Sequence, residues 1–368
     1  MLYKKFQDIQ ISTLGLGSLR FPLEEGSKTR IDRSAAQEVI DCALGNGINY
    51  VDTAYTYNKG DAEVFLGEAL KSHPRDSYLL ASKFYVKVTK DIRSVFEEQL
   101  RRCQTDYFDF YLFHSLDEKC IDLYTDQELD YLGYLQEQKK NGRIRYLGFS
   151  SHAQPDTLER FLQWFPGFDM AQIQANYLDW KILDAKKQYE ILEKYGIPTW
   201  IMEPLKGGRL VNLSPDAAAI LKEAEPEASL ASWSFRFLMG QPNIQTVLSG
   251  MSTVEQVEEN VRIFSEMKPL NEEELKILQK AADIFVKKMG VPCSACRYCC
   301  ETCPAGLDIP QLIKGYNEYC ISGETWKVSG AHSFSKGPSA CLGCGACERH
   351  CPQRIHIPEI MRRFAEVL

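Results

Sequence analysis

Eight short apolar segments alternate with longer amphipathic ones along most of the chain, and this alternation limits the fold more than any other feature. The intervening segments have helical periodicity: within 91–104, for example, Ile92, Val95, Phe96 and Leu100 would share one face. Alternating strands and helices predict a parallel sheet covered by helices. The predicted strands lie at 11–18, 48–54, 77–84, 108–115, 144–150, 170–176, 197–204 and 244–250.

Eight such units favour a closed (β/α)8 barrel, or TIM barrel, over an open doubly wound sheet. An open sheet of the dinucleotide-binding kind predicts a GxGxxG turn after the first strand. The sequence there is Gly15-Leu16-Gly17-Ser18-Leu19-Arg20, which lacks the third glycine. We therefore expect an α/β barrel over residues 1–265, a connecting helix within 266–290, centred on 271–289, and a small domain of helices and loops over 291–368.

Composition excludes several classes of protein. The net charge is −7 without a long basic block, which disfavours nucleic-acid binding. No apolar run approaches the roughly 18 residues that span a bilayer. The first residues, MLYKKFQDIQ, lack the apolar core of a signal peptide. We expect a cytoplasmic protein with no membrane partner; its oligomeric state stays open.

Ten of the 13 cysteines follow Val291, and eight of these form two copies of one spacing. The copies are Cys293-x2-Cys296-x2-Cys299-x3-Cys303-Pro304 and Cys341-x2-Cys344-x2-Cys347-x3-Cys351-Pro352. In bacterial ferredoxins this spacing binds [4Fe–4S] clusters, and the cysteine beside proline ligates the other cluster. We therefore predict two [4Fe–4S] clusters in a ferredoxin-like domain. One would be held by Cys293, Cys296, Cys299 and Cys351, and the other by Cys341, Cys344, Cys347 and Cys303.

Zinc and disulfides are the alternative interpretations of these cysteines. Structural zinc sites usually take two CxxC pairs separated by a loop, and disulfides are rare in the cytosol. Two further cysteines, Cys300 and Cys320, remain outside the spacing. Cys300 could replace a ligand through a register shift, but both fit ordinary small apolar positions better.

Four polar side chains lie at or just beyond the carboxyl ends of consecutive predicted strands. Asp52 ends one strand, Tyr57 follows five residues later, and Lys83 and His114 end the next two. In a barrel this end is the catalytic face. Each residue alone has an ordinary explanation: a surface ion pair, a packed ring or a hydrogen-bonded core histidine. Together they indicate one shared site, because a buried Lys and a buried Asp at strand ends need each other as partners.

In identity, order and strand position, these four residues resemble the catalytic tetrad of the aldo-keto reductase family. The resemblance covers about residues 1–265. With the cysteine motifs, the chain resembles the branch of the family that carries a C-terminal two-cluster ferredoxin-like domain. Further similar motifs are Gly142-x-Ile144-Arg145-x-Leu147-Gly148-Phe149-Ser150, Pro204-Leu205-x-Gly207-Gly208 and Glu255-Gln256-x3-Asn260.

The resemblance implies an enzyme that reduces a carbonyl, or oxidises an alcohol, with a nicotinamide cofactor. Tyr57 would donate the proton, although tyrosine is a weak acid with an ordinary pKa near about 10. The Lys83 ammonium would lower the cost of forming tyrosinate, and Asp52 would keep that lysine charged. His114 would orient the carbonyl oxygen and stabilise its developing negative charge.

The resemblance also places the nicotinamide cofactor across the barrel mouth. Ser150 and Gln172 would bind the carboxamide, the loop at 205–208 would approach the pyrophosphate, and residues 250–260 the adenosine. The expected cofactor-binding residues are Gly17, Ser18, Asp52, Ser150, Gln172, Leu205, Lys206, Gly207, Gly208, Gly250, Ser252, Gln256 and Asn260.

Three departures from the family affect the cofactor. Ser151-His152 follows Ser150 where many members have asparagine, and Met202-Glu203 occupies the region where many stack an aromatic ring on the nicotinamide. Residues 250–255 contain no Lys or Arg to meet the 2′-phosphate of NADP, although Lys206 or Arg262 could reach it from elsewhere. We therefore expect NAD(H) to be favoured over NADP(H), and the altered stacking position leaves room for a flavin instead.

The clusters would carry electrons to or from a partner such as a ferredoxin or flavodoxin. Because hydride moves two electrons and each cluster moves one, two other functions stay open. One is a single-electron or flavin-mediated reductase that does not use NAD(P)H directly. The other is a non-enzymatic electron carrier or redox sensor, which the intact tetrad argues against. The sequence does not identify the substrate or the physiological direction.

Overall fold

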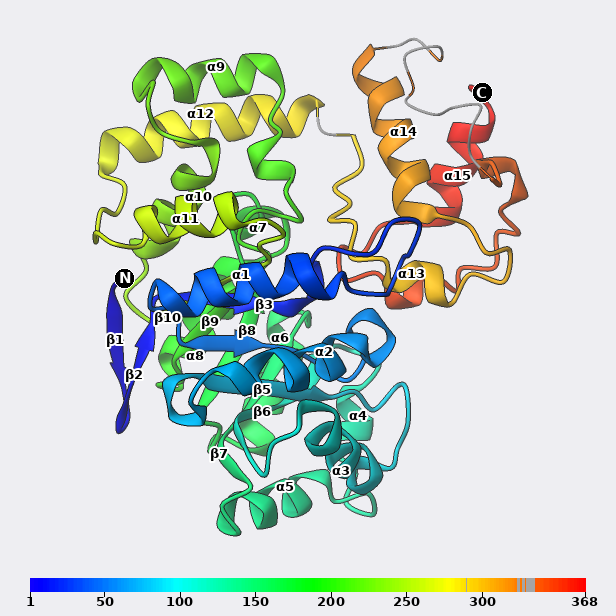
Figure 1. The fold of residues 1–368 in the computed structure, drawn as a ribbon. Helices are drawn as coiled ribbons and strands as arrows, with labels where there is room; N and C mark the ends of the chain where they lie inside the picture. Colours follow the sequence, from blue (N-terminus) through cyan, green and yellow to red (C-terminus); the bar gives the residue numbers. More distant parts are fainter. Residues whose placement is uncertain (289, 323–324, 326–327, 329–334) are drawn as a thin grey trace. The chain divides into compact units, whose positions relative to one another are not determined.

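The computed structural model describes the chain except residues 289, 323–324, 326–327 and 329–334 (Figure 1). It divides into two compact units, of which the first comprises Met1–Pro204 and Phe235–Pro269. In this unit eight parallel strands form a closed barrel, in which the last strand pairs with the first. The strands are β3 (Leu14–Gly17), β4 (Tyr50–Asp52), β5 (Leu79–Phe84), β6 (Phe108–Leu116), β7 (Ile144–Ser151), β8 (Met170–Gln174), β9 (Thr199–Met202) and β10 (Ile244–Ser249).

The predicted barrel is confirmed, and all eight predicted strands form. The first prediction, 11–18, merged the end of one strand with the whole of another. Strands β1 (Tyr3–Phe6) and β2 (Ile9–Ser12) form an antiparallel hairpin before the barrel begins at β3. β2 ends and β3 begins with buried residues, so the buried pattern continues across the break between them.

The barrel is filled at the amino ends of its strands. Phe6 from the hairpin packs edge-on against Tyr146 and Trp200, with ring centroids 5.0 and 5.1 Å away. Tyr50 and Phe110 belong to the same buried cluster. This packing leaves chemistry to the opposite, carboxyl ends of the strands.

Helices follow the strands because their apolar residues recur with helical spacing. Helix α3 is an example: the Asp91 side chain accepts a hydrogen bond from Ser94 N at its start, and Ile92, Val95 and Phe96 are buried. The α-helices of this unit, α3 included, are α1 (Arg33–Gly45), α2 (Asp61–Ala69), α3 (Ile92–Cys103), α4 (Ile121–Tyr124), α5 (Tyr131–Lys140), α6 (Pro155–Trp164), α7 (Asp179–Ile182), α8 (Ala185–Lys194) and α11 (Val254–Ile263).

The second unit comprises Leu205–Ser234 and Leu270–Leu368, so a segment that follows β9 groups with the cysteine-rich end of the chain. Helix α10 (Leu230–Met239) spans the division between the units. The helix expected at 271–289 is α12, and Met289 lies outside the described residues. Helices of this unit are α9 (Pro215–Ala224), α12 (Glu272–Lys288), α13 (Tyr298–Glu301), α14 (Ile309–Ser322) and α15 (Ile357–Ala365).

Two pairs of helices organise the second unit: α9 lies along α12, and α14 packs against α15 (Figure 1). The core around α14 and α15 contains Ile309, Ile313, Met361 and Phe364, and the cysteines pack against it. Within the described part of the chain, none of the helices has the length and apolar character needed to cross a membrane.

Candidate active site and metal centres

The four residues of the predicted tetrad meet at the carboxyl ends of neighbouring strands. Asp52 is the last residue of β4, Lys83 lies in β5 and His114 in β6, and these strands pair in order. Tyr57 begins the short 3-10 helix η2 (Tyr57–Gly60), which follows β4. All four side chains are buried, and Lys83 has no exposed surface.

Lys83 is the centre of this group. Its Nζ donates hydrogen bonds to Asp52 Oδ1 at 2.5 Å and to the carbonyl oxygen of Thr53 at 2.7 Å. The same Nζ lies 5.1 Å from the centroid of the Tyr57 ring. A positive charge is therefore fixed beside the tyrosine whose ionisation it would favour.

Burial works against both members of the ion pair. It raises the pKa of Asp52 and lowers the pKa of Lys83, and in each case the charge and hydrogen bond of the other member oppose the shift. Each member of such a buried pair compensates the charge of the other, so removing either one destabilises the fold.

His114 faces the tyrosine, and the two ring centroids are 5.8 Å apart in an edge-on arrangement. Burial, and then the charges of Lys83 and His152, lower the pKa of His114 well below its ordinary value, so the ring is neutral at pH 7. Among the described residues, its Nδ1 has no hydrogen-bond partner. A neutral imidazole with an uncommitted nitrogen suits hydrogen bonding to a substrate oxygen.

A second buried carboxylate, Glu63, is connected to Lys83 through hydrogen bonds of Ser82 and Gln99. No role for Glu63 was predicted from the sequence. Glu63 Oε1 accepts hydrogen bonds from Ser82 Oγ at 2.7 Å and from Gln99 Nε2 at 2.6 Å. Gln99 also donates to the carbonyl oxygen of Lys83 at 3.1 Å. The sequence does contain one sign that Glu63 is buried: it is a glutamate within the mostly apolar run Ala62–Leu66.

Ser150 and Gln172 are brought together as expected for a carboxamide site. They pair across β7 and β8. Ser150 Oγ accepts a hydrogen bond from Ser115 N at 2.8 Å. Gln172 is buried, and its Oε1 has no partner in the described part of the chain. An uncompensated buried amide oxygen fits a ligand amide that donates to it.

The expected adenosine residues lie together after β10. Ser252 N donates to Gln256 Oε1 at 2.8 Å, and Asn260 Nδ2 donates to Ser249 Oγ at 3.1 Å. Gly17 ends β3 beside this segment, and Ser18 follows in the 3-10 helix η1 (Ser18–Arg20).

Arg20 is a cation in this region that the sequence analysis missed. A Cβ atom added at Gly250 would lie 2.6 Å from Arg20 Cγ, and Ser252 Oγ donates to the Arg20 carbonyl oxygen at 2.6 Å. No local signal could have shown this, because β3 and β10 become neighbours only when the barrel closes.

The loop at Leu205–Gly208 belongs to the second unit, separately from the other expected cofactor residues. Lys206 is fully buried there, and its Nζ donates to Gln353 Oε1 at 2.8 Å. Gly207 and Gly208 both have positive φ angles, of 63° and 88°, which glycine adopts without strain.

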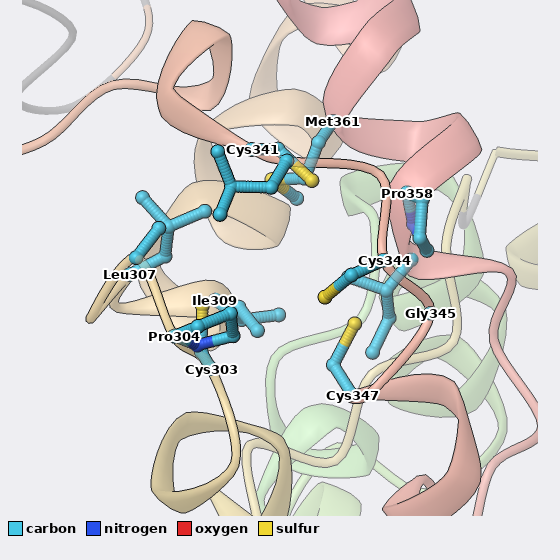
Figure 2. A pocket seen from close by; sticks show the side chains of 13 residues that line it. Cys303, Pro304, Leu307, Ile309, Cys341, Cys344, Gly345, Cys347, Pro358 and Met361 are labelled. Carbon is cyan, nitrogen blue, oxygen red and sulfur yellow. The ribbon is translucent and has the colours of Figure 1, made fainter.

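Two cavities in the second unit are each lined by four of the predicted cluster ligands. The cysteines that line cavity A are Cys293, Cys296, Cys299 and Cys351. Those that line cavity B are Cys303, Cys341, Cys344 and Cys347. In Figure 2 the sulfur atoms of Cys344 and Cys347 point into cavity B.

Each cavity thus combines three cysteines of one motif with the proline-linked cysteine of the other. Four cysteines around each cavity, in the ligand spacing of two-cluster ferredoxins, suit an iron–sulfur cluster better than zinc. The remaining two cysteines, Cys300 and Cys320, are not among the described residues that line either cavity.

A barrel with a buried Asp–Lys–Tyr–His group, together with a module of paired cysteine cavities, defines an oxidoreductase that carries iron–sulfur clusters. Comparison with known proteins supports this class. Residues 13–283 match the aldo/keto reductase family, and residues 292–355 match the 4Fe-4S dicluster domain. The chain therefore belongs to the aldo/keto reductase family, whose members are NAD(P)-dependent carbonyl oxidoreductases, and carries a C-terminal 4Fe–4S dicluster domain.

Individual relatives match about three quarters of the chain or slightly less. An uncharacterised oxidoreductase of Bacillus subtilis is 26% identical, over 74% of this chain and 93% of its own length. The NADH-specific methylglyoxal reductase of Escherichia coli is 26% identical, over 69% of this chain and 90% of its own. The solved structure of an aldo-keto reductase from Bacillus halodurans is 26% identical with a TM-score of 0.63, and the match covers 76% of this chain and 96% of that one.

Proposed function

We propose that the barrel reduces a small carbonyl compound with NADH, and that the two [4Fe–4S] clusters, each carrying one electron, together exchange the two electrons of the nicotinamide with a separate redox protein. The observation that carries the first part is the Lys83 ammonium fixed between Asp52 and the Tyr57 ring. The observation that supports the second is the pair of cavities with four cysteines each. When bound, the nicotinamide supplies a hydride and the clusters supply single-electron transfer.

The side chains of the barrel would control the proton and the orientation of the substrate. The Tyr57 hydroxyl donates its proton to the carbonyl oxygen, and Lys83 stabilises the tyrosinate that remains. Asp52 keeps Lys83 protonated. His114, neutral because of its burial, donates a hydrogen bond to the same oxygen and stabilises negative charge as it develops.

NADH is proposed over NADPH because residues 250–255 contain no cation and include Glu255. Placing a 2′-phosphate there without a positive partner is unfavourable, and one such pair is worth about 1.5–3 kcal/mol. The NADH specificity of the Escherichia coli relative agrees with this proposal. Arg20 is the cation that could reverse it, since its side chain lies against Gly250.

The two-cluster domain would exchange electrons with a ferredoxin or flavodoxin. Next to cavity B the side chain of Leu342 is 70% exposed, and Cys344 is also exposed. A cluster ligand at the surface shortens the path for an electron to a docked partner.

Spectra of the anaerobically purified protein test both parts. NADH should bleach the iron–sulfur absorption and should do so at lower concentration than NADPH. Carbonyl reduction without bleaching would refute the electron relay but leave the reductase. Bleaching by dithionite alone, with no carbonyl reduction by either nucleotide, would refute the reductase. If NADPH binds ten times more tightly, the Arg20→Gln variant should abolish that preference.

A further inference from the structure

A fully buried lysine, Lys206, contacts a residue that lines cavity A. Lys206 Nζ donates to Gln353 Oε1 at 2.8 Å, and Gln353 is itself buried. Gln353 lines cavity A and lies two residues after Cys351, one of the four cysteines of that cavity. Because the side chain of Gln353 is neutral, this hydrogen bond itself places no negative charge beside the lysine.

The loop that carries Lys206 contacts the wall of cavity A at two further points. A Cβ atom on Gly207 would lie 1.9 Å from the carbonyl oxygen of Ser294, so only glycine allows the observed approach. Arg209 Nη1 donates to the carbonyl oxygens of Val291 at 2.7 Å and Cys293 at 3.4 Å. The position of Lys206 is therefore determined by several contacts and not by one flexible side chain.

Cavity B has a different electrostatic environment. The described residues that line it carry no charged side chain. A nearby lysine, Lys336, donates to the carbonyl oxygen of Ala305 at 2.6 Å, but it is exposed. Water and salt screen an exposed charge much more effectively than a buried one.

This asymmetry has a consequence for reduction of the clusters. Reduction adds one negative charge to a cluster, and net charge close to the cluster is one of the factors that set its reduction potential. A fixed positive charge in a site of low dielectric constant stabilises the reduced form more than a screened charge does.

We infer that Lys206 raises the reduction potential of the cluster held by Cys293, Cys296, Cys299 and Cys351, and that the other cluster lacks such a control. Lys206 is thus a tuning residue that acts through its charge on the cluster in cavity A. This inference rests on the cluster assignment in the proposed function but not on the carbonyl reaction or on the choice of nucleotide.

The test is a redox titration of the full-length holoprotein, with dithionite and mediators, followed by electron paramagnetic resonance. Lys206→Met should lower the midpoint potential of one cluster and leave that of the other unchanged. Lys336→Met is the matched control, because it removes an exposed lysine beside cavity B, and it should shift neither midpoint comparably. Lys206→Arg, which keeps the charge, should stay closer to the wild type than Lys206→Met.

A second variant tests whether buried charge beside cavity A acts on the cluster. Gln353→Glu keeps a hydrogen-bond acceptor for Lys206 but adds a negative charge, so it should lower the same midpoint. Because Gln353 itself lines cavity A, buried charge alone accounts for this shift. A purely structural Lys206 predicts instead that Lys206→Met, with its iron retained, does not lower the midpoint of one cluster selectively.

The inference is overturned if Gln353→Glu leaves both midpoints unchanged, or if Lys206→Met shifts the two clusters equally. If Lys206→Met loses iron, Gln353→Glu and Lys206→Arg decide the question. A wild-type protein without any iron–sulfur signal would instead refute the cluster assignment itself.

Discussion

The Asp52→Asn variant should be strongly destabilised at neutral pH and much less so at alkaline pH. The substitution keeps the shape of the side chain but removes the negative charge 2.5 Å from Lys83 Nζ. Lys83 has no exposed surface. Without its partner it must therefore either remain charged in a poorly solvated site or lose its proton.

Loss of the proton limits the cost of the substitution. Starting from an ordinary lysine pKa of about 10.4, deprotonation at pH 7 costs about 1.4 kcal/mol for each pH unit, or about 4.6 kcal/mol in total. This agrees with the roughly 3–5 kcal/mol expected when one partner of a buried ion pair is removed. At pH 9 the same route costs only about 1.9 kcal/mol.

The direction of the pH dependence follows from the protons bound in each state. Burial lowers the pKa of Lys83, and in the variant Asp52 no longer opposes that shift. At pH values between the lowered pKa of Lys83 in the folded variant and its ordinary pKa, the unfolded chain therefore binds more protons than the folded one, and the free energy of unfolding rises with pH.

Urea denaturation of the anaerobic holoprotein at pH 7, 8 and 9 measures this effect. Glu97→Gln is the control, because it breaks a half-exposed ion pair with Arg143 at 2.8 Å and should cost less than about 1 kcal/mol at every pH. A loss in Asp52→Asn below about 1 kcal/mol at pH 7, or a larger loss that stays constant up to pH 9, would refute the reasoning.

Three further predictions concern the tetrad and the clusters. Tyr57→Phe should lower the turnover of carbonyl reduction by about 100- to 10,000-fold while the dissociation constant for NADH changes little, because only the proton donor is lost; a variant with most of its turnover would exclude this role. Because Cys303 lines cavity B and Cys351 lines cavity A, Cys303→Ser should disturb the cluster of the 341–347 motif, and Cys351→Ser that of the 293–299 motif, in paramagnetic resonance spectra. The opposite pattern would show that the ligands do not cross over. Burial lowers the pKa of His114, so below about pH 6.5 the unfolded chain gains a proton there and the folded chain does not. The free energy of unfolding therefore falls on acidification, by up to about 1.4 kcal/mol per pH unit. In urea denaturation at decreasing pH, His114→Gln should remove this part of the fall in the free energy of unfolding. If the fall is unchanged in the variant, the native ring takes up the proton.

Much of the barrel could be predicted because its signals are local. Buried parallel strands are short apolar runs, and helices such as α3 have one apolar face, so both patterns are visible in adjacent residues. Asp52, Lys83 and His114 could be assigned to one site because neighbouring parallel strands place their carboxyl ends at the same rim.

Other features of the site depend on contacts between residues far apart in the chain. The supporting hydrogen bonds of Glu63 come from Ser82 and Gln99, which no local pattern connects with it. The hairpin strand β2 was merged with β3 because the apolar pattern continues through both, and only their pairing partners distinguish them.

The sequence by itself determined the class of fold, the tetrad and the two cysteine motifs, because periodicity and ligand spacing are properties of short segments. Tertiary structure alone decided which charges from distant parts of the chain lie near the predicted sites. Barrel closure places Arg20 beside Gly250, some 230 positions later in the chain. Folding of the second unit places Lys206 on Gln353, beside cavity A. Electrostatic energy depends on distance through space and on burial, and neither quantity can be obtained from the order of residues.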